Sequence, residues 1–408
     1  MFQIDKPKIW SIGLLHMGQS FPGALSAVAL PALFRENGLP LEMFWLFALP
    51  LIPGWFRWLM AVVIDNHGSA EFGYRKSWIL PCTVTGTLVY LCLSFVDPTP
   101  AFLILIISLL FVKSIVMTAQ DVAIDGLAAE SFNDAERATG AAIIVFLMFM
   151  GTVAAQGMVA AVPHIGWQTM MVIAALLLFV VAIPSLLRTE APAPKAAQER
   201  RLAMESASVL EFVLRKESQI VMPLLLAIGF SSNLMRAMLP VYLVDLGLSL
   251  TQIGLIFGFA VVTGTSLATY VIPLLSKYMS RSRLSSWLVA GYIPCCLLFL
   301  AMNLNDLSFT TIALALTYVM FISTAIWMLV MQARLEWSSD RQAATDFSSQ
   351  ASLANIGEWA GASAGGFLAA AFGWLWFFNI AWVLSAAAGI AFVCALTPIN
   401  RLISNRSV

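Results

Sequence analysis

The sequence predicts an all-α membrane protein in which twelve transmembrane helices form two pseudo-symmetric six-helix bundles. Sixty per cent of the 408 residues are apolar and only 11% are charged, which is about half the charged fraction of a soluble domain. Apolar stretches of about 20 residues, long enough to cross a bilayer, recur along the chain. One long polar segment, beginning at Arg188, divides these stretches into six and six.

The first half contains six predicted spans, and the first of them needs justification. It follows Lys6 and Lys8, as the apolar region of a signal peptide would. However, it is about 24 residues long and more spans follow it, so we expect a retained helix. The six spans lie at roughly 9–32, 41–63, 77–97, 101–124, 138–162 and 168–187.

The second half repeats this arrangement after the polar segment. Its predicted spans lie at roughly 219–243, 249–275, 285–303, 308–331, 346–371 and 374–397. We therefore expect an N-terminal bundle over residues 1–187, a cytoplasmic linker over 188–218 and a C-terminal bundle over 219–408.

The positions of the cations predict the orientation of these spans. With the N-terminus inside, eighteen of the 22 Lys and Arg residues fall in cytoplasmic segments, and Arg35 alone falls outside. Lysine and arginine near span ends stay on the cytoplasmic side. A missed helix would invert every later loop and remove the asymmetry. We therefore expect a multi-pass membrane protein with both termini in the cytoplasm.

An internal repeat supports two related halves. A shift of 206 residues places Glu130–Gly140 on Glu336–Asp346, with identical residues at four positions. The same shift places Arg75 on Arg281, in the loops after the second and eighth spans. Paired six-helix halves around a central cavity are typical of secondary transporters, in which the substrate binds near the midplane.

Several function classes are disfavoured by composition. The 22 cations balance the 22 anions, so no basic excess indicates nucleic acid. The five cysteines lack metal-ligand spacing, and no GxxxxGK[ST] loop is present, so we expect neither a metal nor a cofactor, and no direct use of ATP. The expected partners are the lipid bilayer, protons and a small-molecule substrate, and we expect a monomer.

Ionisable and amide side chains within the spans are the candidate site residues, because buried charges in a membrane face a cavity or a partner. Arg57 requires an acid or an anion beside it. Lys113 would bind an anionic substrate, or be neutralised by an acid from another helix. The predicted substrate or cavity residues are His16, Gln19, Arg57, Lys113, Gln120, Asn233, Arg236, Asn355 and Trp359.

Three acids are the candidates for proton coupling. Asp121 and Asp125 are four residues apart and therefore neighbours on one helix surface. Glu358 lies in the middle of the eleventh span. The alternative to proton coupling is that Glu358 forms a buried structural ion pair with Arg236 or Arg57.

Asp65 and the stretch "GYRKS" (Gly73 to Ser77) resemble the loop signature of the major facilitator superfamily. The chain departs from that signature at Ala61 and Asn66 and has a longer stretch before Gly73. This resemblance implies a gating role for Asp65, Gly73, Arg75 and Lys76. The stretched loop and "AQDVAIDGLAAE" (Ala119 to Glu130) are similar to the AmpG-like branch of muropeptide permeases and acetyl-CoA transporters. Residues 23–44 look most like siderophore importers of the RhtX/FptX type.

The resemblance implies import of a bulky, often anionic solute into the cytoplasm, driven by protons, with a ferric siderophore as the expected solute. A muropeptide or acetyl-CoA-like permease and a proton-driven multidrug exporter are alternatives. A membrane prenyltransferase is a further alternative, because Asp121, Asp125 and the acids near Glu130 and Glu336 resemble carboxylate sites for magnesium.

Overall fold

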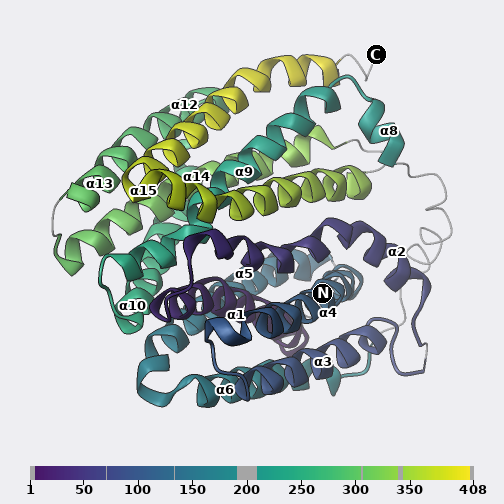
Figure 1. The fold of residues 1–408 in the computed structure, drawn as a ribbon. Coiled ribbons are helices and arrows are strands. Elements are labelled where there is room, and N and C mark those ends of the chain that lie inside the picture. The colour runs from purple at the N-terminus through teal and green to yellow at the C-terminus, as the bar shows by residue number, and fades with distance from the viewer. Residues whose placement is uncertain are drawn as a thin grey trace. The chain divides into compact units, whose positions relative to one another are not determined.

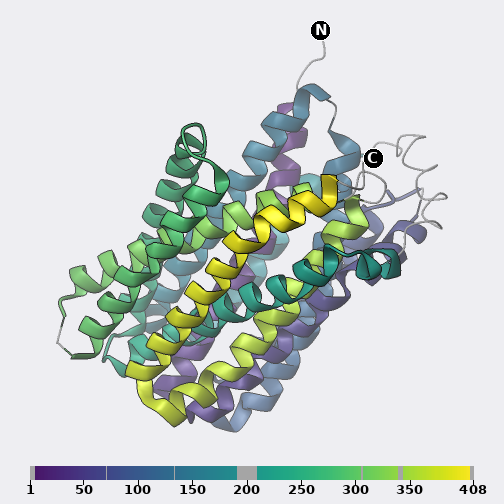
Figure 2. The same cartoon turned by 90° about the horizontal axis from the view of Figure 1, so that it is seen from above.

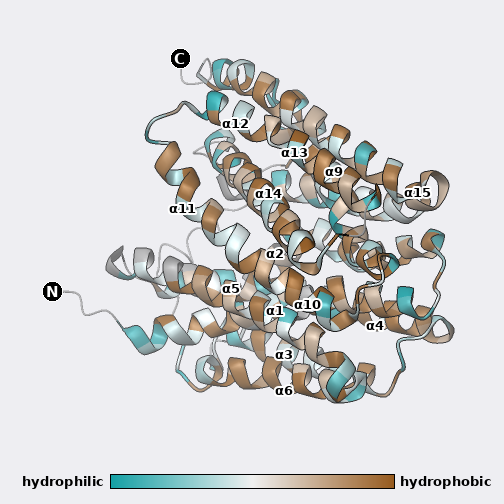
Figure 3. Ribbon diagram, turned by 90° about the vertical axis from the view of Figure 1, so that its left-hand side faces the viewer, coloured by the Kyte–Doolittle hydropathy of each residue, from teal (hydrophilic) through white to brown (hydrophobic). Residues whose placement is uncertain are grey.

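The structure is a computed structural model that describes residues 5–69, 71–132, 134–190, 209–304, 307–338 and 343–404. Helices make up almost all of this described part, which contains no named strand (Figure 1). Hydrophobic residues occupy most of the length of these helices (Figure 3). The all-α prediction is therefore confirmed.

Every predicted span of the first half is helical. The second span begins as a long 3₁₀ segment, η1, and continues as α2. The elements are α1 (Lys6–Glu36), η1 (Leu41–Phe56), α2 (Arg57–Asn66), α3 (Lys76–Ser94), η2 (Pro100–Phe102), α4 (Leu103–Ser131), α5 (Asp134–Ile165) and α6 (Trp167–Leu186).

The predicted spans of the second half are helical as well. The eighth span contains a π-helical turn, η4, and the tenth span is one continuous helix. The elements are α8 (Val209–Leu214), α9 (Ser218–Asp245), α10 (Leu250–Ala260), η4 (Val261–Thr265), α11 (Ser266–Leu275), α12 (Arg281–Ala290), α13 (Tyr292–Leu304), α14 (Phe309–Trp337) and α15 (Ala343–Ser404).

The segment α15 contains the last two predicted spans. Gly373 has a positive φ of 70° inside it, a conformation that residues with a Cβ atom rarely adopt, and this residue separates the two helices. Among the described residues, ten stretches are long and apolar enough to cross a membrane, and one of them covers both of these helices. The chain is thus a multi-pass membrane protein.

The chain divides into two compact units. Unit 1 comprises the described residues of Met1–Gly38, Phe56–Ser206 and Ser249–Gly254. Unit 2 comprises those of Leu39–Trp55, Ala207–Leu248 and Leu255–Val408. Most of the predicted linker 188–218 lies outside the described residues, which resume at Val209. Residues 41–55 of η1 thus belong to unit 2, and α2 belongs to unit 1.

Unit 1 is built around α1, which packs against α4, α5 and α6, while α3 packs against α4 and α6. Figure 1 shows α3 and α6 side by side. Apolar residues of α1 and α4, including Ile12, Leu15, Ala123 and Ile124, form a buried core cluster. The polar residues of these same helices are therefore held at fixed positions beside that core.

Unit 2 is built around the long contact between α9 and α15, which lie side by side (Figure 2). Glycines allow the two backbones to approach. A Cβ atom on Gly229 would meet the carbonyl oxygen of Ala354, and one on Gly361 would meet that of Phe230. The sequence "GASAGG" (Gly361 to Gly366) therefore permits close helix contact, as its small residues predict.

The second and eighth spans both depart from α-helical geometry at equivalent positions. The π turn η4 covers Val261–Thr265, and a shift of 206 residues places it on residues 55–59, where η1 gives way to α2. Inside η4, Thr263 donates a 3.4 Å hydrogen bond to Thr317 of α14. Such local departures are common at functional positions in helices.

Candidate functional site

The centre of the polar cluster in unit 1 is Arg57, the first residue of α2. Its Nη1 donates to Asp121 Oδ2, and its Nη2 donates to Asp125 Oδ2 at 2.5 Å. The two acids are one turn apart on α4, so a single guanidinium can reach both. Two carboxylates share one cation, and the group carries one excess negative charge when both acids are ionised. The prediction that Arg57 needs an acid partner is met by α4 of its own unit.

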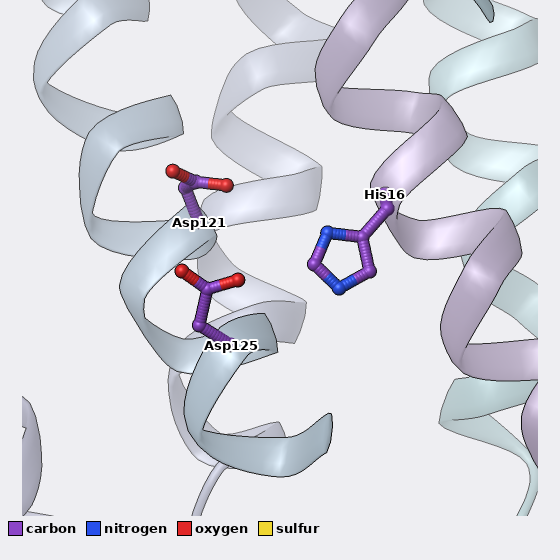
Figure 4. A group of neighbouring side chains, drawn as sticks. All are labelled: His16, Asp121 and Asp125. Carbon is purple, nitrogen blue, oxygen red and sulfur yellow. The ribbon is translucent and has the colours of Figure 1, made fainter. Parts of the chain in front are cut away.

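His16 of α1 faces these two acids. Figure 4 shows its imidazole turned toward Asp121 and Asp125 from the neighbouring helix. One ligand atom from each of the three residues lies within 4.8 Å of the others. His16 is 5% exposed, and its Nε2 has no hydrogen-bond partner among the described residues. His16 thus lies beside the two acids, with no hydrogen bond from its Nε2 to either of them.

The same three side chains present a set of ligand atoms that would suit a divalent cation. Arg57 already bonds to both carboxylates, so a metal ion would have to displace a guanidinium held by two charge-assisted hydrogen bonds. The two carboxylates are therefore occupied by the Arg57 guanidinium, and a metal site would form here only if Arg57 moved away.

A chain of amides joins three helices beside this cluster. Gln19 of α1 donates to Gln120 of α4 at 2.5 Å, and Gln120 donates to Thr83 of α3 at 2.6 Å. Gln120 is almost fully buried. A buried, paired network of this kind fixes the relative positions of the helices that contribute to it. Gln19 and Gln120 therefore hold α1 and α4 in register, which keeps His16 opposite Asp121.

Lys113 lies eight residues before Asp121 on α4, and its environment differs from that of Arg57. Its Nζ donates to Ser26 Oγ of α1 at 3.3 Å. Ser26 also lies near the hydroxyl of Tyr90 on α3. Of the two alternatives for Lys113, neutralisation by an acid is not observed among the described residues.

The polar cluster of unit 2 joins α9 to α15. Arg236 Nη2 lies 3.4 Å from Glu358 Oε2, and Arg236 Nε donates to Asn233 Oδ1 at 3.1 Å. Asn233 closes the cluster by donating to the backbone oxygen of Glu358 at 3.0 Å. The pair is accessible, since 60% of the Arg236 side chain and 32% of the Glu358 side chain are exposed. Of the two partners considered for Glu358, Arg236 is the observed one.

Asn355 and Trp359 contact η1 within unit 2. Asn355 Nδ2 donates to the carbonyl oxygen of Gly54 at 3.2 Å. Trp359 stacks edge-to-face on Trp55, with ring centroids 5.1 Å apart. A carbonyl in the 3₁₀ segment around Pro53 is bonded less regularly than in an α-helix, and Asn355 supplies a partner. Both residues therefore hold the end of η1, in the middle of the second span.

The loop before α3 is anchored by Glu190, which follows α6. The Glu190 carboxylate accepts from the backbone N–H groups of Arg75 at 2.9 Å and Lys76 at 3.0 Å, which are among the unpaired donors at a helix start. Gly73 has a φ of 113°, and a Cβ atom there would lie 2.7 Å from Glu190 Oε2. Only glycine suits this position. The side chain of Asp65, the remaining predicted gating residue, lies outside the described residues.

Arginine–glutamate pairs occupy equivalent positions in the two units. Arg75 Nη2 lies 2.7 Å from Glu130 Oε1, and the pair at positions shifted by 206 residues joins Arg281 to Glu336, with 2.6 Å between Nη1 and Oε2. The sequence repeat predicts this equivalence. Because Glu130 and Glu336 are held by arginines, they are not free to bind the magnesium ions that a prenyltransferase requires.

Several residues of the site were not predicted. Ser26, Thr83 and Glu190 complete the hydrogen bonds of Lys113, Gln120 and the α3 start, and Tyr90 lies near Ser26. Serine, threonine and tyrosine are common in spans, so their presence carried no signal. Glu190 had one available signal, since it is the first acid after the sixth span.

Comparisons with known proteins agree with this architecture. The family model described as Major Facilitator Superfamily matches residues 12–335. The anhydromuropeptide permease of Escherichia coli (strain K12) is 25% identical over 205 residues, which cover 49% of this chain and 42% of the permease. The chain thus matches less than half the length of that relative.

Two solved structures share the fold. A bacterial homolog of the human lysosomal transporter Spinster, in an inward-facing and unoccupied conformation, has a TM-score of 0.76 and 14% identity, covering 98% of this chain and 99% of its own. The nucleoside transporter NupG has a TM-score of 0.72 and 13% identity, covering 96% of this chain and 99% of its own. At these identities the likeness concerns the fold.

Proposed function

The chain belongs to the major facilitator superfamily and is a secondary transporter rather than an enzyme, and on that premise we propose that it couples proton entry to the import of a bulky anionic solute. The anhydro-muropeptide class is the favoured solute, because the anhydromuropeptide permease of E. coli is a relative over about half of the chain, 49%. We also propose that the protein is a monomer of the bacterial inner membrane, and the cation distribution favours cytoplasmic termini.

The observation that carries the proton coupling is the cluster of Arg57 with Asp121 and Asp125. Two carboxylates on one guanidinium leave one excess negative charge. Such a charge is costly within a membrane protein, and binding of one proton removes it. His16 lies beside the pair with a buried ring nitrogen that has no partner in the described part of the chain. The cluster therefore has the composition of a site that binds and releases a proton.

Unit 2 supplies a third acid for proton binding. Glu358 contacts Arg236 at 3.4 Å and is partly accessible. We assign proton binding to Asp121, Asp125 and Glu358, and solute contact to Arg236 and Asn233 when Glu358 is protonated.

The siderophore expectation rests on residues 23–44 alone, and neither the permease nor the two solved structures support it. The muropeptide class takes precedence because a relative over half of the chain carries that name. Export of drugs and transport of acetyl-CoA-like compounds are the remaining alternatives, and the transport assay distinguishes both from muropeptide import.

The test uses the purified protein in proteoliposomes with an imposed proton gradient. Labelled anhydro-muropeptide, ferric siderophores, acetyl-CoA and a cationic dye are offered separately. We expect gradient-driven accumulation of the anhydro-muropeptide, which Asp121→Asn and Glu358→Gln abolish. Glu42→Gln, an exposed acid at the start of η1, is the control and should leave the rate unchanged. Unchanged accumulation in both variants would refute the coupling assignment. Accumulation of only one of the other compounds would show that this compound is the solute, instead of the anhydro-muropeptide.

A further inference from the structure

Lys113 is a buried cation whose partners do not include a carboxylate. It is 8% exposed, and its Nζ donates a 3.3 Å hydrogen bond to Ser26 Oγ. No acid lies within ion-pair distance of its ammonium among the described residues. A charged group in this position costs several kcal/mol if it stays unpaired. A function that supplies an anion would explain why the residue is a lysine.

The acids of α4 do not neutralise Lys113. Asp121 and Asp125 follow it by eight and twelve residues on the same helix, which places their backbones about 12 Å and about 18 Å farther along the axis. Both acids bond to Arg57. Helix α4 thus contributes to two separate charged sites in unit 1. The site of Arg57, Asp121 and Asp125 has excess negative charge, and Lys113 has a positive charge that no acid among the described residues neutralises.

The groups around Lys113 form a set of hydrogen-bond donors from three helices. Ser26 comes from α1, Tyr90 from α3 and Lys113 from α4. The Tyr90 hydroxyl lies near Ser26, and Tyr90 is 1% exposed. Hydroxyl groups rotate to donate or accept as needed. The Lys113 ammonium therefore offers one charge and N–H donors to an incoming oxygen ligand, and the Ser26 hydroxyl lies beside it.

The single charge indicates the class of anion. A carboxylate carries one negative charge, which one ammonium neutralises. A phosphate monoester carries about −1.5 to −2 and would leave excess charge buried. Phosphate sites also favour the planar fork of arginine, and Arg57, which lies within a span of the same unit, is held by two acids.

We propose that Lys113, with Ser26 and Tyr90, binds a carboxylate of the transported solute, whereas Arg57 stays with Asp121 and Asp125 and serves the proton. This inference rests on the proposed transport function, since it requires a solute that enters unit 1. The inference gives Arg57 and Lys113 different roles, whereas the sequence alone placed both among the substrate or cavity residues.

The test measures binding separately from transport. The probes are an anhydro-muropeptide with free carboxylates and the same compound with its carboxylates converted to methyl esters. Thermal stabilisation of the purified protein gives the affinity for each probe. We expect wild-type protein to prefer the acid to the ester by about tenfold or more, the size of a hydrogen bond to a charged group.

Lys113→Met should abolish this preference by weakening acid binding while leaving ester binding within about twofold. Lys113→Gln is the second variant, and Ser26→Ala should lower the preference by a smaller factor of about two to ten. Lys277→Met, which removes an exposed lysine of unit 2, is the matched control and should keep the wild-type preference. Removal of a buried unpaired charge is neutral or stabilising, so the Lys113 variants are expected to fold.

The outcomes separate the two proposals. Equal binding of acid and ester by the wild type, or a full preference in Lys113→Met and Lys113→Gln, would overturn the carboxylate site, and the transport function would stand on gradient-driven accumulation. Lys113-dependent binding of the acid without gradient-driven accumulation would overturn the transport function and leave the carboxylate site supported.

Discussion

Arg75 and Glu130 form a buried ion pair in unit 1, with 2.7 Å between Nη2 and Oε1. The pair joins the start of α3 to the end of α4. Its counterpart 206 residues later, Arg281 with Glu336, joins α12 to the end of α14 in unit 2. The side chains differ in burial: Arg75 and Glu130 are 5% and 15% exposed, whereas Arg281 and Glu336 are 24% and 52% exposed.

This difference predicts unequal stability effects for the same substitution. Glu130→Gln removes the acid from a buried arginine and should lower the free energy of unfolding by about 3–5 kcal/mol. Glu336→Gln breaks a largely exposed pair and should cost about 0–1 kcal/mol. Thermal unfolding in detergent measures both. Equal losses in the two variants would contradict the role assigned to burial.

Removing Arg57 should convert the acid cluster into a metal site. In Arg57→Ala the two carboxylates lose their cation, and His16, Asp121 and Asp125 keep ligand atoms within 4.8 Å of one another. Such a set suits Co²⁺ or Zn²⁺. We expect Co²⁺ to raise the unfolding temperature of Arg57→Ala and to leave that of the wild type unchanged.

The control for this experiment adds His16→Ala to Arg57→Ala. The double variant should lose most of the stabilisation by Co²⁺, because one of the three ligands is gone. Equal stabilisation of the single and the double variant would show that Co²⁺ binds elsewhere.

The glycine contact between α9 and α15 predicts that even a small side chain at position 361 lowers the free energy of unfolding. A Cβ atom on Gly361 would meet the carbonyl oxygen of Phe230 and lie 2.9 Å from the backbone nitrogen of Leu234. Gly361→Ala must therefore push the backbones apart, and we expect a loss of about 1–3 kcal/mol. Gly157→Ala on α5 is the control, since nothing lies within 4 Å of its Cβ position, and it should gain about 0.5–1 kcal/mol. A neutral Gly361→Ala in thermal unfolding would disprove the tight contact.

The start of unit 2 offers a second contrast between buried and exposed pairing. Arg215, just after α8, lies 2.5 Å from Asp346 and 2.9 Å from Glu211, whose side chains are 0% and 40% exposed. Burial is the largest single effect on the pKa of Arg215 and lowers it, but the hydrogen bonds and charges of Asp346 and Glu211 together raise this pKa above its usual value. Arg215 therefore stays charged at every pH of interest.

Asp346→Ala leaves this permanent charge without its buried partner and should cost about 3–5 kcal/mol. Glu211→Ala removes an exposed partner four residues away and should cost about 0.3–0.5 kcal/mol. Urea titration of helicity measures the two variants, and a larger loss for Glu211→Ala than for Asp346→Ala would contradict this assignment.

The two units are alike in the ion pairs that join their helix ends and unlike in the polar residues within their spans. The pair Lys8–Glu136 joins α1 to α5 at 2.6 Å, as Arg215–Asp346 joins the segment before α9 to α15. By contrast, the residues 206 positions after Asp121 and Asp125 are Trp327 and Met331. The paired acids of unit 1 thus have no counterpart at the equivalent positions of unit 2, so the proposed proton and solute sites differ between the units.

The sequence by itself determined the fold class and the candidates for function. Apolar stretches about as long as a bilayer is thick predict helices wherever they occur, because an unpaired backbone in lipid is prohibitively costly. The same cost identified Arg57, Lys113, Asp121, Asp125 and Glu358, since a charge within a span is retained only for a partner or a function. Spacing along one helix also placed Asp121 and Asp125 side by side.

Only the tertiary structure decided which of these charges meet. Arg57 is 64 residues from Asp121, and Arg236 is 122 residues from Glu358, so no local pattern joins them. Helix packing brings Arg57 to both acids and leaves Lys113 with Ser26, although the sequence around the two cations does not distinguish their roles. The physical reason is that a side chain's partner is set by how neighbouring helices rotate and slide against each other, and periodicity along a single helix does not contain that information.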